Sequence, residues 1–226
     1  MIGGQPDSER IGQRITAFLG TLRQYVGLSG SKKREPLNDP ESLRTFLETR
    51  ASLVAQTSLY GYLRTRAGSR YPDLFDDDDF VVSINIAKWQ IWLDCLSDLS
   101  IYTGAMVIQR SDIEEDRLAL FMESLVESII ADAGWPHEAG MAFPEHAAGV
   151  LTRIRHCAWS TIEDGEDAFS RSPESLVTWT PIIDELKQLD ASIVRNSVRY
   201  RWQEIRREFR DLLDAETLIQ KLPPAV

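Results

Sequence analysis

Two long stretches of this chain carry apolar side chains at every third or fourth position, a spacing that is typical of amphipathic helices. We expect one helix over residues 39–67, with Asp39 as its N-cap, Pro40 at its first helical position and Gly68 as its stop. We expect another over residues 78–110. Because the connection between them is short, they are predicted to pack antiparallel at the centre of the fold.

Helical periodicity dominates the rest of the chain as well, and no pair of strands with a hairpin turn is visible. Near the amino terminus, apolar residues step by three and four from Ile11 to Val26. Four further helices are expected: one capped by Ser111 and ended by Gly134, one that carries Val150, Ala158 and Ile162, one that starts at Ser172 and is kinked or divided by Pro181, and one over residues 191–221. The sequence therefore predicts an all-α fold of about seven helices.

Composition divides the chain into three parts. Residues 1–27 are predicted to form an amphipathic helical arm, and residues 28–38 form a polar, basic and proline-containing linker. The remaining residues, 39–222, are predicted to form a helical bundle domain. A chain of 226 residues is long enough for such a domain to bury about 70% of the surface of the unfolded chain.

Charge and cysteine content limit the partners and the compartment. The net charge of −10 opposes binding to nucleic-acid phosphates and to anionic lipids. Two cysteines, Cys95 and Cys157, favour a reducing compartment over a disulfide framework. The amino terminus lacks the pattern of a secretory signal, and the longest uncharged run, residues 99–109, is too short to span a bilayer. We therefore predict a cytoplasmic protein without nucleic-acid binding or membrane insertion.

Polar residues interrupt the apolar faces of both central helices. Arg50 falls in the middle of the first face, and Asn85 and Lys88 fall within the second. A buried charge is costly unless it is paired, so these groups require partners. Two explanations stay open. Either Asp94, Asp98 or Glu48 holds Arg50 in an internal network, or these residues form a pocket for an anionic ligand or a carboxylate of a protein partner.

Tyrosines and arginines follow on the same helix, and this combination suits the recognition of anions. If the polar residues form a ligand site, Asp94 or Asp98 is the candidate base of an enzyme. The candidate ligand-binding residues are Arg50, Tyr60, Arg64, Asn85, Lys88, Asp94 and Asp98.

No motif for catalysis, a cofactor or a metal is recognisable. The four aspartates at 76–79 lack the ligand spacing of a calcium loop and instead suit a helix N-terminus. There is no Glu-x-x-His pair for a di-iron bundle, no phosphate-binding glycine loop and no Gly-x-Ser-x-Gly elbow. The sequence therefore predicts no cofactor, no metal and no catalytic residue.

The tract ETRASLVAQTSLYGYLRTRAGSRYPDLFDDDDF, together with SINIAKWQIWLDCLSDLSIY, resembles a group of uncharacterised bacterial all-helical proteins. Some members of that group are labelled esterases. Because this chain has no hydrolase elbow to match, the resemblance implies a helical fold and no catalytic residue here.

These observations favour a helical interaction or regulatory protein that binds a protein partner or self-associates through an exposed stripe on its first or last helix. The last helix is rich in arginine, which either forms salt bridges within the chain or presents a basic face to a partner. The alternative is an enzyme, for example a hydrolase, or a small-anion-binding protein with a polar site between the two central helices.

Overall fold

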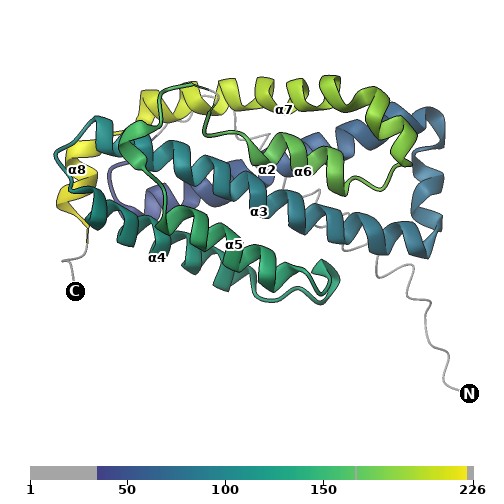
Figure 1. The fold of residues 1–226 in the computed structure, drawn as a ribbon, viewed down its shortest axis with the longest axis horizontal. Helices are drawn as coiled ribbons and strands as arrows, with labels where there is room; N and C mark the ends of the chain where they lie inside the picture. The colour runs from purple at the N-terminus through teal and green to yellow at the C-terminus, as the bar shows by residue number, and fades with distance from the viewer. Residues whose placement is uncertain (1–34, 166, 223–226) are drawn as a thin grey trace, which may run out of the picture. The chain divides into compact units, whose positions relative to one another are not determined.

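The computed structural model describes residues 35–165 and 167–222, and these residues form a bundle of seven α-helices without strands (Figure 1). The all-α prediction is thus confirmed. The arm predicted for residues 1–27 lies outside the described residues. The helices are α2 (Pro40–Ala67), α3 (Asp78–Gln109), α4 (Glu115–Ala133), α5 (Phe143–Arg155), α6 (Arg171–Trp179), α7 (Asp184–Leu212) and α8 (Ala215–Gln220), with 3-10 turns η1 (Gly68–Arg70), η2 (Pro72–Asp76), η3 (His137–Ala139) and η4 (Trp159–Thr161).

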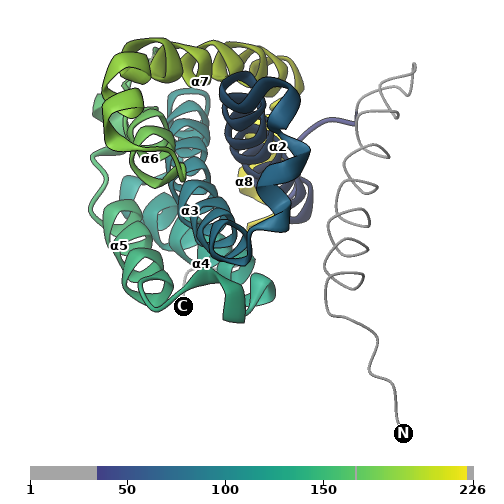
Figure 2. The same cartoon turned by 90° about the vertical axis from the view of Figure 1, so that its right-hand side faces the viewer.

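The centre of the bundle is α3. Every residue from 90 to 107 is buried, because α2, α4, α5 and α6 all pack against this helix (Figure 2). α7 lies across α2 and α6 and closes the remaining side. The two long helices predicted at the centre, α2 and α3, are in contact as expected.

Among the described helices, α3 is the one that is long and apolar enough to cross a membrane. Its apolar 18-residue stretch is 94% buried inside the bundle.

The ends of the central helices follow the predicted signals. The Asp39 carboxylate accepts a hydrogen bond from the Ser42 N–H (2.8 Å), and the Ser42 side chain accepts one from the Asp39 N–H in return. Gly68 ends α2 with φ of 55°, a conformation that strains other residues. Asp77 caps α3, so the aspartate run does serve a helix N-terminus. The cap predicted at Ser111 is wrong, since its hydroxyl donates to the Val107 carbonyl at the end of α3.

The helix predicted to continue through Ile162 ends earlier, at Arg155. The chain leaves the helix so that Trp159, which is fully buried, reaches Gly104 on α3. A Cβ atom on Gly104 would lie 2.2 Å from Cζ3 of Trp159, so the absent side chain makes room for the indole ring. Cys157, which falls within the span of that predicted helix, consequently lies in the loop.

The helix predicted to start at Ser172 ends at Trp179, before Pro181. α7 begins at Asp184, earlier than the predicted residue 191. α7 ends at Leu212, where the backbone pairs with the start of the bundle. The Leu37 N–H donates to the Leu212 carbonyl (2.8 Å), and the Asp214 N–H donates to the Leu37 carbonyl (3.1 Å). The short helix α8 follows this bridge.

Candidate functional site

Arg50 faces α7 and not α3. Its Nε and Nη2 donate to the two carboxylate oxygens of Glu208 at 2.8 and 2.6 Å. The predicted partners of Arg50 (Asp94, Asp98 or Glu48) are therefore wrong. The periodicity placed Arg50 on an inner face of α2 but carried no information about which helix covers that part of the face.

Asn85 and Lys88 contact each other near the amino end of α3, where their partner is η3 and not Arg50. The Lys88 ammonium donates to the Asn85 side chain (3.4 Å) and to Glu138 (2.6 Å), which also accepts from the Trp89 indole N–H (3.2 Å). Glu138 belongs to η3, so this cluster ties η3 to α3.

The two candidate residues near the end of α2 differ in burial, since Tyr60 is half-buried and Arg64 is exposed. Burial, with smaller contributions from Tyr71 and Glu138, raises the pKa of Tyr60 to about 12. The Arg64 guanidinium lies 5.4 Å from the ring centre of Tyr71, and Arg64 itself is exposed. The cation–π contact accounts for Arg64 without a ligand.

Asp94 and Asp98 face away from α2, toward α5 and α6. Asp94 lies 3.0 Å from Nε2 of His146, and the other ring nitrogen of His146 contacts the Gln90 side chain. Asp98 is fully buried and accepts from Nη1 of Arg153 at 2.7 Å. Both carboxylates thus have partners on α5, and neither faces Arg50.

Asp98 also caps α6 from a different helix. Its carboxylate accepts the backbone N–H groups of Arg171 (3.1 Å) and Ser172 (2.7 Å), whereas the N-cap residue of α6, Ser170, makes no cap of its own. Burial raises the pKa of Asp98, and Arg153 and the Ser172 N–H oppose that rise. This arrangement holds both α5 and α6 on α3, so Asp98 has a structural role.

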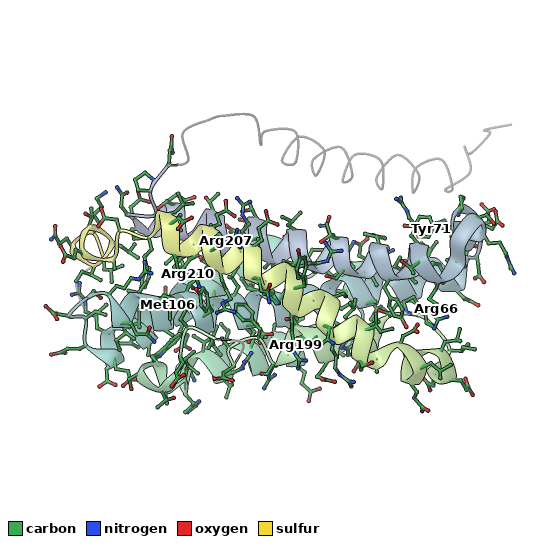
Figure 3. The ribbon with its side chains drawn as sticks, turned by 90° about the horizontal axis from the view of Figure 1, so that it is seen from above. Arg66, Tyr71, Met106, Arg199, Arg207 and Arg210 are labelled. Atoms are coloured by element: carbon green, nitrogen blue, oxygen red, sulfur yellow. The ribbon has the colours of Figure 1, made fainter. Side chains whose placement is uncertain are left out.

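α2 and α7 pack against each other and run antiparallel. Ion pairs hold both ends of this contact: Arg50 with Glu208 at one end, and Arg66 with Asp190 at the other. The Tyr62 hydroxyl also donates to Asp190 (3.0 Å). Figure 3 shows α7 crossing the bundle from Arg210 and Arg207 toward the end that lies near Arg66.

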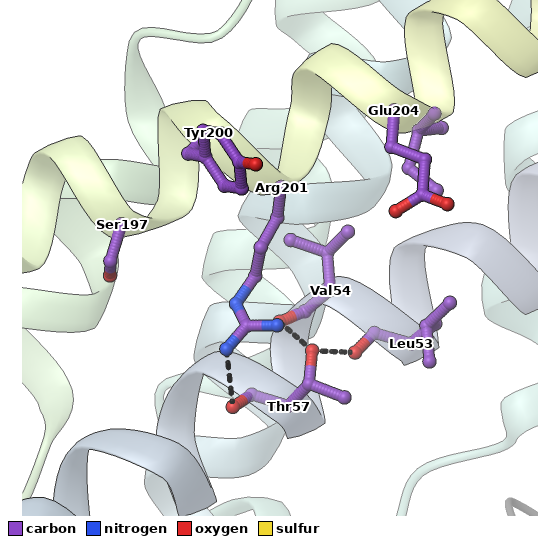
Figure 4. A pocket seen from close by; sticks show the side chains of 8 residues that line it. Leu53, Val54, Thr57, Ser197, Tyr200, Arg201 and Glu204 are labelled. Atoms are coloured by element: carbon purple, nitrogen blue, oxygen red, sulfur yellow. Dashed lines mark hydrogen bonds between the residues drawn. The ribbon is translucent and has the colours of Figure 1, made fainter.

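Between these two ion pairs lies a cavity of about 420 Å³, which we call the α2/α7 cavity (Figure 4). Side chains from both helices line it: Leu53, Val54 and Thr57 from α2, and Ser197, Tyr200, Arg201, Glu204 and Ile205 from α7. None of these residues was among the predicted site residues.

Several arginines of α7 form ion pairs within the chain. Arg195 pairs with Glu174, and Arg206 and Arg210 both pair with Asp164, so the predicted salt bridges within the chain exist for these three. Arg201 differs, because its one hydrogen bond to the described residues is a long contact (3.4 Å) from Nη2 to the Thr57 carbonyl.

Because Asp190 is paired with Arg66, we expect the free energy of unfolding to fall when the solution is made acidic. The hydrogen bonds from Arg66, with an opposing effect of burial and a further contribution from Tyr62, lower the pKa of Asp190 below its usual 3.8. The carboxylate therefore stabilises the fold at pH values above 3.8, and that contribution is lost as the pH falls through the lower folded-state pKa. In urea unfolding between neutral pH and pH 3, an Asp190→Asn variant should lose less stability on acidification than the wild type. Equal pH slopes would contradict the assignment.

A second unusual surface is the outer face of α7. Leu189, Ile193 and Tyr200 are exposed by 74, 70 and 73%. At about 100° of rotation per residue, these three lie within one narrow line along the helix. The line is opposite the buried face of α7, which carries Val194, Val198, Trp202, Ile205 and Phe209. We call this line, together with the half-buried Leu186, the α7 stripe.

Among residues 35–165 and 167–222, no group of three or more histidine, cysteine, aspartate or glutamate side chains is arranged to hold a metal ion. No protein-family model matches the chain, and no curated protein or solved structure is significantly similar to it.

Proposed function

We propose that this protein is a self-associating helical interaction protein and that two copies pair through their α7 stripes. The observation that carries the proposal is the line of three largely exposed apolar side chains on one helix. With Leu186 they are spaced by three, four and seven residues, which matches positions a and d of a heptad repeat. Such a line loses contact with water when it packs against another helix.

We infer that the α7 stripe packs against the α7 stripe of a second copy of this chain, in antiparallel orientation. The start of α7 is acidic, with Asp184 and Glu185, and Arg207 lies exposed on the same line near its other end. An antiparallel copy places these opposite charges next to each other, and it places Leu189 of each copy opposite Tyr200 of the other. Asn196, which lies within the stripe, is the kind of polar residue that fixes the register of paired helices.

The test is a change of Ile193 to glutamate. Because Ile193 is on the surface, the monomer should keep its fold, whereas the dimer should weaken about 100-fold or more, since the lost burial counts once in each copy. Sedimentation equilibrium measures the dissociation constant, and circular dichroism checks the helix content. The matched control is Gln188→Glu, an equal change of charge on α7 outside the stripe, which should leave the dissociation constant unchanged.

The orientation has its own test. Arg207→Glu should weaken association, and adding Glu185→Arg should restore it, because the pair is then reversed and not broken. A wild-type protein that sediments as a monomer at every concentration would refute self-association. A dimer whose affinity is insensitive to Ile193→Glu would refute the α7 stripe as its interface.

A further inference from the structure

Within the part of the chain that the structure describes, Arg201 is a half-buried cation without a counter-ion. Among these same residues its buried Nε has no hydrogen-bond partner, and its guanidinium makes one hydrogen bond, to a backbone carbonyl. No carboxylate of the described residues lies within 4.0 Å of its guanidinium nitrogens, although Glu204 lines the same cavity. Removing a guanidinium from water costs free energy that a single long hydrogen bond does not offset.

The same interface pairs its other arginines. Arg50 makes a two-pronged contact with Glu208, and Arg66 makes one with Asp190. The Arg201 guanidinium thus lies in the wall of the α2/α7 cavity, and the close-up in Figure 4 shows it reaching from α7 toward Thr57 on α2. An anion that enters the cavity would give Arg201 the planar two-oxygen partner that the other two already have.

The walls of the α2/α7 cavity define the rest of the ligand. Leu53, Val54 and Ile205 offer apolar surface, and the Thr57 hydroxyl is already used, since it donates to the Leu53 carbonyl (2.6 Å). The Glu204 carboxylate adds a negative charge, which disfavours phosphate and other multiply charged anions. A volume of about 420 Å³ is within the range of small-molecule sites.

We propose that the α2/α7 cavity binds a small monocarboxylate with an apolar body. Arg201 holds the carboxylate of this ligand, while Leu53, Val54 and Ile205 contact its apolar body. This site goes beyond the proposed self-association. Tyr200 contributes to both surfaces, but ligand binding and dimer formation are measured separately. One proposal can therefore be refuted while the other stands.

The test titrates the full-length protein with octanoate by isothermal calorimetry, with inorganic phosphate and octan-1-ol as comparison ligands. We expect saturable binding of one octanoate per chain, weaker binding of octanol and no binding of phosphate. Arg201→Gln should weaken octanoate binding at least tenfold and leave octanol binding unchanged. Arg195→Gln removes the same charge from α7 outside the cavity, so this control should bind octanoate like the wild type.

Two further measurements separate a ligand site from a structural role. Without ligand, Arg201→Gln should melt at the same temperature as the wild type or higher, because an uncompensated charge is removed. Ser197→Phe adds a ring at the exposed edge of the cavity and should block octanoate while leaving Arg201 in place. The proposal is overturned if the wild type shows no saturable octanoate binding, or if either variant binds octanoate with wild-type affinity.

Discussion

Replacing Asp98 with alanine should lower the free energy of unfolding by about 3–5 kcal/mol, because the change leaves Arg153 mostly buried without its carboxylate. It also removes the acceptor for two N–H groups at the start of α6, those of Arg171 and Ser172. Urea unfolding followed by circular dichroism gives the difference. We expect α6 and the segment before it to lose hydrogen-exchange protection first, since they depend on this carboxylate.

A double-mutant cycle checks the cause. In an Arg153→Met background, Asp98→Ala should cost less than in the wild type, because no unpaired cation remains. Asp79→Ala, an exposed aspartate in the first turn of the same helix, is the matched control and should cost under about 1 kcal/mol. If Asp98→Ala were as mild as Asp79→Ala, the cap on α6 would have no energetic importance.

Gly104→Ala should destabilise the protein by about 3 kcal/mol, at the upper end of the usual cost of overpacking. The new Cβ would lie 2.2, 2.7 and 3.0 Å from three ring carbons of Trp159, and a rigid, fully buried indole cannot yield without moving the chain around it. The free energy of unfolding from urea titration is the measurement, and a shift in tryptophan fluorescence should accompany it.

Gly149→Ala is the control for this substitution. Gly149 lies inside α5, and nothing occupies the space around an added Cβ, so alanine there should raise stability by up to about 1 kcal/mol. The two glycine substitutions are thus expected to act in opposite directions. A stabilising Gly104→Ala would show that Trp159 does not occupy this notch on α3.

The sequence was sufficient for most of the helices because their signals are local. Asp39, Gly68 and Gly134 set helix ends that match the structure, and the spacing of apolar residues located α2, α3 and α4. The prediction failed where a distant partner decides the outcome. The helix through Ile162 was wrong because Trp159 has to reach Gly104, and no local pattern encodes that contact.

The candidate site was less accessible to sequence reasoning for the same reason. Periodicity placed Arg50, Asp94 and Asp98 on inner faces, but which helix each one meets depends on the packing of the whole bundle. Arg201 was one arginine among several on the last helix, and only the pairing of its neighbours sets it apart. The α7 stripe had a readable heptad spacing, but a helix predicted to begin at residue 191 excluded Leu186 and Leu189 from it.

The backbone bridge at Leu37 has a consequence for the order of assembly. Its two hydrogen bonds join the segment before α2 to the end of α7. Almost the entire bundle therefore lies within the loop of chain that they close. Closing a loop of that length gains little enthalpy for a large loss of chain entropy until the helices between are already packed. We therefore expect the bridge and α8 to form last as the bundle folds and to come apart first as it unfolds.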